Sequence, residues 1–398
     1  MFSLGVCYEN GTGVEKNAET AVEWYRKAAE AGNAYAMVNL GLCYENGTGV
    51  EQNAETAVEW YRKAADEGDA DAMVNLGGCY MTGTGVEQNA ETAVEWYRKA
   101  AELNYADAIF NLGVCYANGT GVEKNAETAV EWYRKAADAK NIDAICCLGY
   151  CYANGIGVEL DHKRAFNLYS NAAESGHIYA TAFVGVCYQY GRGVERNAET
   201  AVEWYRKAAD AGCGVAMTFL GVCYRDGFGV ERDFAEANRW FRNGIEAGDG
   251  DAAFYLGDVY ERGLGVERDF DEANRLYEQA VELGSYQAAD AVAKRLENGT
   301  CGRKRDLAQA VEYREKAAEL GSVFSAHTLY VYYSNGVGDV VKQDDAKAVA
   351  ALLKAAEQDD YAALKRLAEI YRDGLHGVDV DSLKAKKFEE RAKKIAAQ

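Results

Sequence analysis

Cysteine is the residue with the most evident chemistry in this chain, and many of its 11 cysteines recur at one fixed spacing. The regularly spaced set is Cys7, Cys43, Cys79, Cys115, Cys151, Cys187 and Cys223. A disulfide ladder is excluded because equivalent positions on packed helices lie about 10 Å apart, whereas a disulfide requires Cα atoms within about 7 Å. We therefore predict small, buried side chains at a tight helix contact, and free thiols in this number indicate a reducing compartment.

Other candidate sites for catalysis or metal binding are weak. Cys146, Cys147 and Cys151 fall on one predicted helix and could meet a metal ion or oxidise, but no histidine lies nearer than His162, which argues against zinc. The remaining histidines are scattered over separate segments, and none is placed as the base that a cysteine nucleophile requires. The sequence predicts no catalytic residue, no metal site and no cofactor.

The elements that would position these residues are set by an internal repeat. The segment Ala-Glu-Thr-Ala-Val-Glu-Trp-Tyr-Arg-Lys-Ala-Ala occurs without change from Ala18, Ala54, Ala90, Ala126 and Ala198. A period of about 36 residues is typical of a solenoid, in which one small unit is stacked many times. We predict an all-α fold, a right-handed α-solenoid superhelix of about eleven antiparallel helix pairs, forming one domain over residues 1–398.

Each unit reads as two helices. In residues 33–68 the apolar positions Ala36, Leu40 and Tyr44 indicate a first helix. Asn53 is a suitable N-cap for a second helix, and Gly68 is a suitable C-cap. A loop containing Gly47 and Gly49 joins them, and these glycines are better explained by a tight turn than by phosphate binding, since no strand precedes them.

Both ends of the chain depart from the regular unit. Met1 occupies the position that Met37 and Met73 hold in their units, so we expect the chain to open in the middle of a helix. At the other end, residues 382–396 read as a lysine-rich capping helix. Its lysines would cover the open end of the solenoid while Phe388 and Ile395 face inward.

The pattern Leu40-Gly41-x-x-Tyr44-x-x-Gly47-x-Gly49-Val50, followed by Ala57-x-x-Trp60-Tyr61-x-Lys63-Ala64-Ala65-x-x-Gly68, resembles the Sel-one-like repeat (SLR) family. The resemblance extends over nearly the whole chain. It implies a tetratricopeptide-like solenoid and the role of a non-enzymatic adaptor or scaffold that assembles protein complexes. A cysteine-rich branch of the family staples each repeat with two cysteines, and this chain mostly supplies one.

Composition restricts the partners. The formal net charge of −20 argues against nucleic acid, which binds clustered Lys and Arg. No apolar run approaches the roughly 20 residues that cross a bilayer. A cytoplasmic location is expected from the free thiols; a secretory route stays open because the N-terminus reads as incomplete.

The free arc of the first helices is where a partner would bind, because the first helix usually lines the concave face of such solenoids. Helical phase places on or near this arc Val38, Asn39, Asn75, Phe110, Asn111, Cys147, Tyr150, Phe183, Phe219, Phe254 and Tyr255. Asparagine amides can bind peptide backbone, and aromatic rings are typical anchors of binding hot spots. The alternative is that these side chains only fill gaps between helices.

The sequence thus favours a non-enzymatic adaptor that binds protein or peptide partners on this concave face. A secreted or lumenal factor that contacts host proteins or glycans is the second interpretation. A hydrolase or enzyme subunit is the third.

Overall fold

The computed structural model describes residues 1–396, which are helical almost throughout. Each pair consists of an odd-numbered first helix and an even-numbered second helix. The helices are α1 (Phe2–Asn10), α2 (Ala18–Glu30), α3 (Ala34–Asn46), α4 (Ala54–Asp66), α5 (Ala70–Thr82), α6 (Ala90–Glu102), α7 (Ala106–Asn118), α8 (Ala126–Asp138), α9 (Ile142–Asn154), α10 (His162–Glu174), α11 (Ile178–Tyr190), α12 (Ala198–Asp210), α13 (Gly214–Asp226), α14 (Phe234–Glu246), α15 (Gly250–Arg262), α16 (Phe270–Glu282), α17 (Tyr286–Asn298), α18 (Leu307–Glu319), α19 (Val323–Asn335), α20 (Asp345–Glu357), α21 (Tyr361–Asp373) and α22 (Ser382–Ala396), with a short 3-10 helix at Leu375–Gly377.

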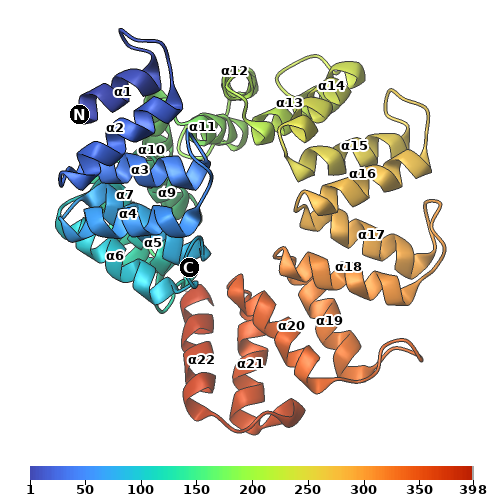
Figure 1. The fold of residues 1–398 in the computed structure, drawn as a ribbon. Helices are drawn as coiled ribbons and strands as arrows, with labels where there is room; N and C mark the ends of the chain where they lie inside the picture. The colour runs from blue at the N-terminus through green and yellow to red at the C-terminus, as the bar shows by residue number, and fades with distance from the viewer. Residues whose placement is uncertain (397–398) are drawn as a thin grey trace. The chain divides into compact units, whose positions relative to one another are not determined.

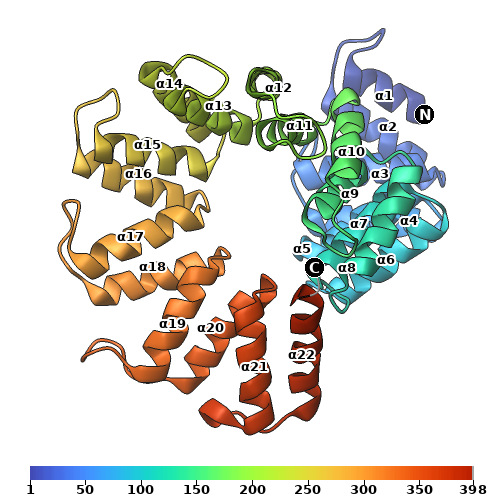
Figure 2. The same ribbon diagram turned by 180° about the vertical axis from the view of Figure 1, so that it is seen from behind.

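The chain divides into two compact units, Met1–His177 and Ile178–Gln398. Within each unit, every helix packs mainly against the helices next to it in the chain (Figure 1). The same pairs are seen from behind in Figure 2. The only β contact in residues 1–396 is the bridge between Val337 and Val341, so the predicted α-solenoid of about eleven helix pairs is confirmed.

Local sequence sets the ends of the helices. The side chain of Asn53 accepts from the backbone amide of Thr56 at 2.9 Å, which satisfies one of the unpaired amides of the first turn of α4. Helix α3 ends at Gly47, whose φ of 70° is left-handed and therefore favours glycine. The C-cap of α4 is Glu67 rather than the predicted Gly68, which follows with a φ of 88°.

The loop inside each pair contacts the preceding pair. A Cβ added to Gly49 would lie 2.4 Å from the carbonyl carbon of Ala18, at the start of α2. This glycine is therefore required for close backbone approach as well as for its φ of 70°. Turn geometry and packing account for the glycine loops.

The C-terminal pairs are less regular, but the capping helix forms as predicted. Phe388 stacks on Tyr371 with ring centroids 5.8 Å apart, and Phe388 and Ile395 both pack against the buried cluster. The lysines Lys384, Lys386 and Lys393 are exposed. Among the described helices, none combines the length and apolar character that a membrane-spanning segment needs.

Candidate functional site

The first helices leave one face open, which we call the open stripe. It consists of the columns that begin in α3 with Tyr35, Asn39, Leu42 and Asn46, together with the equivalent positions of the other first helices. Tyr35 is 62% exposed and Leu42 is 37% exposed, although both belong to a helix whose other face is buried. Exposed aromatic and aliphatic side chains in a repeating column are candidates for partner contact.

Most of the predicted binding residues lie on or next to this stripe. The half-buried ones are Asn39, Asn75, Phe110, Asn111, Cys147, Phe183, Phe219, Phe254 and Tyr255. Tyr150 is 50% exposed. Val38 needs correcting, because it is only 7% exposed and belongs to the hydrophobic core. The larger Phe110 and Phe254 occupy the same column and remain half-buried, so this column lies at the edge of the stripe, where larger side chains reach solvent.

The aromatic members also serve packing. Phe219 lies 5.1 Å from the ring of Tyr205, and Tyr255 stacks on Phe241 at 5.7 Å. Phe110 and Phe254 pack in the same way on Tyr133 and Tyr277. Each ring therefore covers a second-helix aromatic with one face and leaves only part of its surface accessible. Packing between helices therefore accounts for part of the surface of these side chains, and partner binding stays a prediction.

First helices of the second unit approach one another across the stripe. Helix α13 contacts α15, and α15 contacts α17. Burial raises the pKa of the Tyr255 hydroxyl, and the nearby Asp251 and Tyr190 act in the same direction. Tyr190 belongs to α11, two pairs before α15, so its hydroxyl acts on a residue of a more distant first helix.

The family of these repeats follows from comparison with known proteins. A family model described as Sel1 repeat matches residues 1–33, 34–69, 70–105, 106–141, 142–177, 178–213, 214–249, 250–285, 287–322, 331–360 and 362–394. The chain belongs to the Sel1 repeat family. Proteins of this family are generally non-enzymatic scaffolds for protein–protein interaction.

Two solved structures support the assignment. A protective antigen of uropathogenic Escherichia coli strains, with an SLR fold, is 32% identical over 93% of this chain and 79% of its own, with a TM-score of 0.56. A Sel1 repeat protein from Oxalobacter formigenes is 35% identical over 61% of this chain and 96% of its own, with a TM-score of 0.57. No curated protein matches the chain.

Within the Sel1 repeats of this chain, a tyrosine of the second helix packs on a glycine of the first. A Cβ added to Gly41 would lie 2.5 Å from the ring of Tyr61. The close neighbour at this glycine column is an aromatic ring of the second helix. The tyrosine hydroxyl then donates to a side chain near the end of the first helix. These hydroxyl–acceptor pairs are Tyr25–Glu9 (2.5 Å), Tyr61–Glu45 (2.5 Å), Tyr205–Gln189 (2.5 Å) and Tyr277–Glu261 (2.9 Å).

Three repeats keep the tyrosine but lack this acceptor. Met81, Ala117 and Ala153 stand where other repeats have Glu or Gln, so this carboxylate or amide is absent opposite Tyr97, Tyr133 and Tyr169. The sequence analysis did not single out these tyrosines. The signal was present in the acceptor column, which changes from Glu45 to Met81 and Ala117 while the tyrosine column does not.

The cysteine column is buried, as predicted, except for the half-buried Cys7: Cys43 is 5% exposed and Cys115 is 3% exposed. Burial raises the pKa of the thiols from the ordinary 9.0. The raised values are about 11 for Cys43, Cys79, Cys115 and Cys187 and about 12 for Cys151 and Cys223. All eleven cysteines are free thiols in the structure, and no cluster of three potential metal ligands occurs in residues 1–396.

These shifts predict a loss of stability at alkaline pH. Above pH 9 the unfolded chain loses thiol protons that the folded chain keeps until about pH 11. Stability contributed by the neutral thiols is therefore complete below pH 9 and falls as the pH rises through 11. We expect the urea midpoint to fall progressively above about pH 9. A Cys79→Ala, Cys115→Ala variant should show a shallower fall, and an equal fall in both proteins would contradict the assignment.

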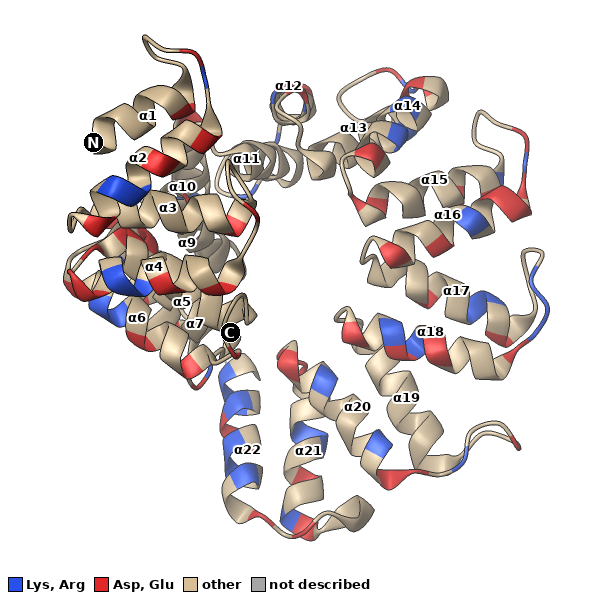
Figure 3. Ribbon diagram, in the orientation of Figure 1, with Lys and Arg blue, Asp and Glu red and all other residues tan. Residues whose placement is uncertain are grey.

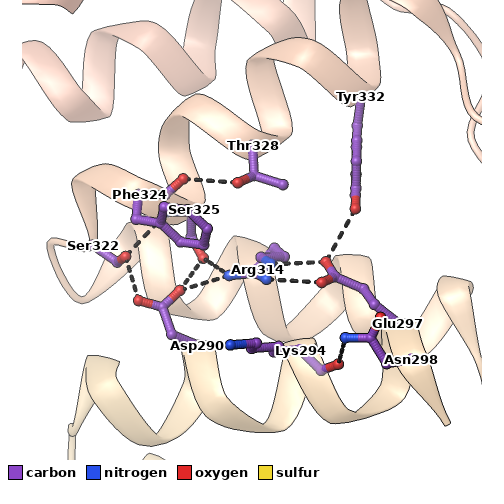
Figure 4. A network of polar contacts seen from close by, with 10 residues as sticks. All are labelled: Asp290, Lys294, Glu297, Asn298, Arg314, Ser322, Phe324, Ser325, Thr328 and Tyr332. Atoms are coloured by element: carbon purple, nitrogen blue, oxygen red, sulfur yellow. Dashed lines mark hydrogen bonds and ion pairs between the residues drawn. The ribbon is translucent and has the colours of Figure 1, made fainter.

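Figure 4 shows the repeat of α17 and α18, in which an arginine replaces the tyrosine of the second helix. Arg314 occupies the tyrosine column and is only 2% exposed. Its Nε and Nη2 each donate to Glu297 at 2.9 Å, and its Nη1 donates to Asp290 at 3.0 Å. Ser322 and Ser325 also donate to Asp290. A buried guanidinium with two carboxylates replaces the tyrosine of the other repeats here.

Proposed function

We propose that this Sel1 repeat protein is an adaptor that binds polypeptide partners along its open stripe. The observation that carries the proposal is the contrast between columns. The packing columns, such as Gly41 and Tyr61, repeat almost unchanged, whereas the Asn39 column changes from amide to aromatic along the chain. Packing against the neighbouring repeat requires uniform columns, so the varied column is available for recognition.

The aromatic part of the stripe supports an anchor role in the second unit. Tyr190 is 59% exposed and Tyr179 is 58% exposed, and both lie on α11. Tyr255 and Phe219 follow on the next first helices, and Arg225 lies over the ring of Tyr255 at 5.2 Å. Tyrosine and arginine are residue types enriched in binding hot spots.

Photo-crosslinking tests this proposal without disturbing the core. A benzophenone amino acid would replace Tyr150 or Tyr190 on the open stripe, and in matched controls it would replace Glu59 or Glu203, which are exposed on second helices. We expect covalent adducts with cell proteins from the stripe positions and few from the control positions. Equal labelling at both sets, or labelling confined to the second helices, would count against the open stripe.

A serine series separates binding from packing. Tyr190→Ser should weaken partner capture without lowering the melting temperature, because the ring is mostly exposed. Phe219→Ser should lower stability by about 2–4 kcal/mol, because its ring packs on Tyr205. Thermal melting monitored by circular dichroism checks both. A sharp loss of stability in Tyr190→Ser would contradict its assignment to the open stripe.

A further inference from the structure

The hydroxyls of Tyr97 and Tyr133 are available for a ligand. Both side chains are 5% exposed, whereas Tyr25 and Tyr61, whose hydroxyls donate to Glu9 and Glu45, are 0% exposed. Within residues 1–396, no side-chain hydrogen bond engages either hydroxyl, and neither hydroxyl is among the fully buried polar atoms that lack a partner. Both hydroxyls therefore keep contact with solvent and can donate to a ligand from outside the chain.

These hydroxyls are directed toward the C-terminal end of the first helix, next to the Asn46 column of the open stripe. In the paired repeats the tyrosine hydroxyl reaches the residue three positions beyond the Leu42 column, and the corresponding residues in the unpaired repeats are Met81 and Ala117. Gly78 replaces leucine in that column on α5, and a Cβ added there would meet nothing within 4 Å. The stripe therefore has open space at the residue next to Gly77, on which the ring of Tyr97 packs.

Amide side chains lie on the same stripe. Asn75 and Asn111 occupy one column on α5 and α7, and both are half-buried. An amide side chain can donate and accept, which matches the peptide group of an extended chain. Together with the two hydroxyls, the stripe offers donors in two successive repeats.

The first helices of this unit carry only negative charge. No Lys or Arg occurs in α3, α5, α7 or α9, and the basic residues of the unit lie on second helices and in loops (Figure 3). Asp71, Asp107 and Asp143 are exposed at equivalent positions on the stripe. Asp71 and Asp107 accept from the neutral side chains of Tyr105 and Asn141, and neither forms an ion pair with Lys or Arg. A cationic partner complements this face.

We propose that the open stripe of α5, α7 and α9 binds an extended polypeptide segment containing Lys or Arg, whose main-chain carbonyl oxygens accept from Tyr97 and Tyr133. The proposal rests on the adaptor function and names the chemistry of one partner. The spacing of packed helices is about 10 Å, which equals about three residues of an extended chain. Three first helices therefore match a segment of about nine residues.

The test uses the full chain and a displayed library of random twelve-residue peptides. We expect the selected peptides to be enriched in Lys and Arg, and their affinity, measured by fluorescence anisotropy, to fall as salt is raised. The Tyr97→Phe, Tyr133→Phe double variant keeps both rings and removes both hydroxyls. It should bind the selected peptides about tenfold more weakly, as expected for two lost hydrogen bonds.

Matched variants separate this site from general effects. Tyr25→Phe with Tyr61→Phe removes hydroxyls that Glu9 and Glu45 already occupy, so peptide affinity should not change. Ala117→Glu restores the acceptor of the other repeats and should occupy the hydroxyl of Tyr133. Gly78→Leu fills open space and should block the stripe. Circular dichroism should show an unchanged fold in each variant.

Three outcomes would overturn the proposal. The first is enrichment of acidic or uncharged peptides, and the second is equal loss of affinity in both double variants. The third is a set of peptides that ignore Tyr97 and Tyr133 but lose affinity in Tyr190→Ser; the adaptor function would then stand and this site would fall. Failure to select any peptide would count against both proposals.

Discussion

Two adjacent glycines of one helix should respond to alanine in opposite directions. A Cβ at residue 77 would lie 2.5 Å from the ring of Tyr97, whereas a Cβ at residue 78 would meet nothing within 4 Å. Gly77→Ala should therefore destabilise the protein by about 1–3 kcal/mol through overpacking. Gly78→Ala should stabilise it by about 1 kcal/mol, because alanine favours the helix.

Local measurement suits this comparison because repeats of a solenoid need not unfold together. Hydrogen exchange of the amides in α5 and α6, combined with urea unfolding of the full chain, reports the local change. Gly113→Ala is the matched control, since its Cβ would lie 2.6 Å from Tyr133. An increase in stability for both Gly77→Ala and Gly113→Ala would show that the tyrosine rings do not lie on the glycine column.

Removing Arg314 should have the largest effect of any single polar substitution. Arg314→Met leaves Asp290 and Glu297 without the guanidinium that neutralises them, at side-chain exposures of 22% and 17%. Breaking a buried ion pair from one side costs about 3–5 kcal/mol. Urea unfolding and hydrogen exchange in α17–α19 should report a loss of that order.

The preceding pair of helices indicates which substitutions should restore the stability lost in Arg314→Met. In the preceding pair, Tyr277 packs on Gly257 and donates to Glu261, and the equivalent residues of the next pair are Arg314, Ala293 and Glu297. Arg314→Tyr with Ala293→Gly should therefore recover much of the lost stability. Arg275→Met, which removes an exposed pair with Glu272, should change stability little. If Arg314→Met were equally neutral, the network in Figure 4 would not stabilise the fold.

The sequence alone determined the class of fold. The 36-residue period predicted the positions of both helices in each pair. This was possible because the capping asparagine, the left-handed glycines and the apolar columns all act within one repeat. It also identified the family and the buried cysteine column. These features depend on local geometry and on contact with a neighbouring repeat of the same sequence. Both can be predicted from the repeated sequence alone.

Tertiary structure decided which residues of the first helix remain open. Helical phase placed Val38 beside Asn39, but packing buries Val38 in the core and leaves Asn39 half-exposed. The structure also shows that Tyr61 and Tyr97, which occupy the same position in identical second helices, have different surroundings. Glu45 accepts from the hydroxyl of Tyr61, whereas Met81 cannot accept from the hydroxyl of Tyr97. Such differences arise from contacts between two helices, where a substitution in one changes the surroundings of an unchanged residue in the other.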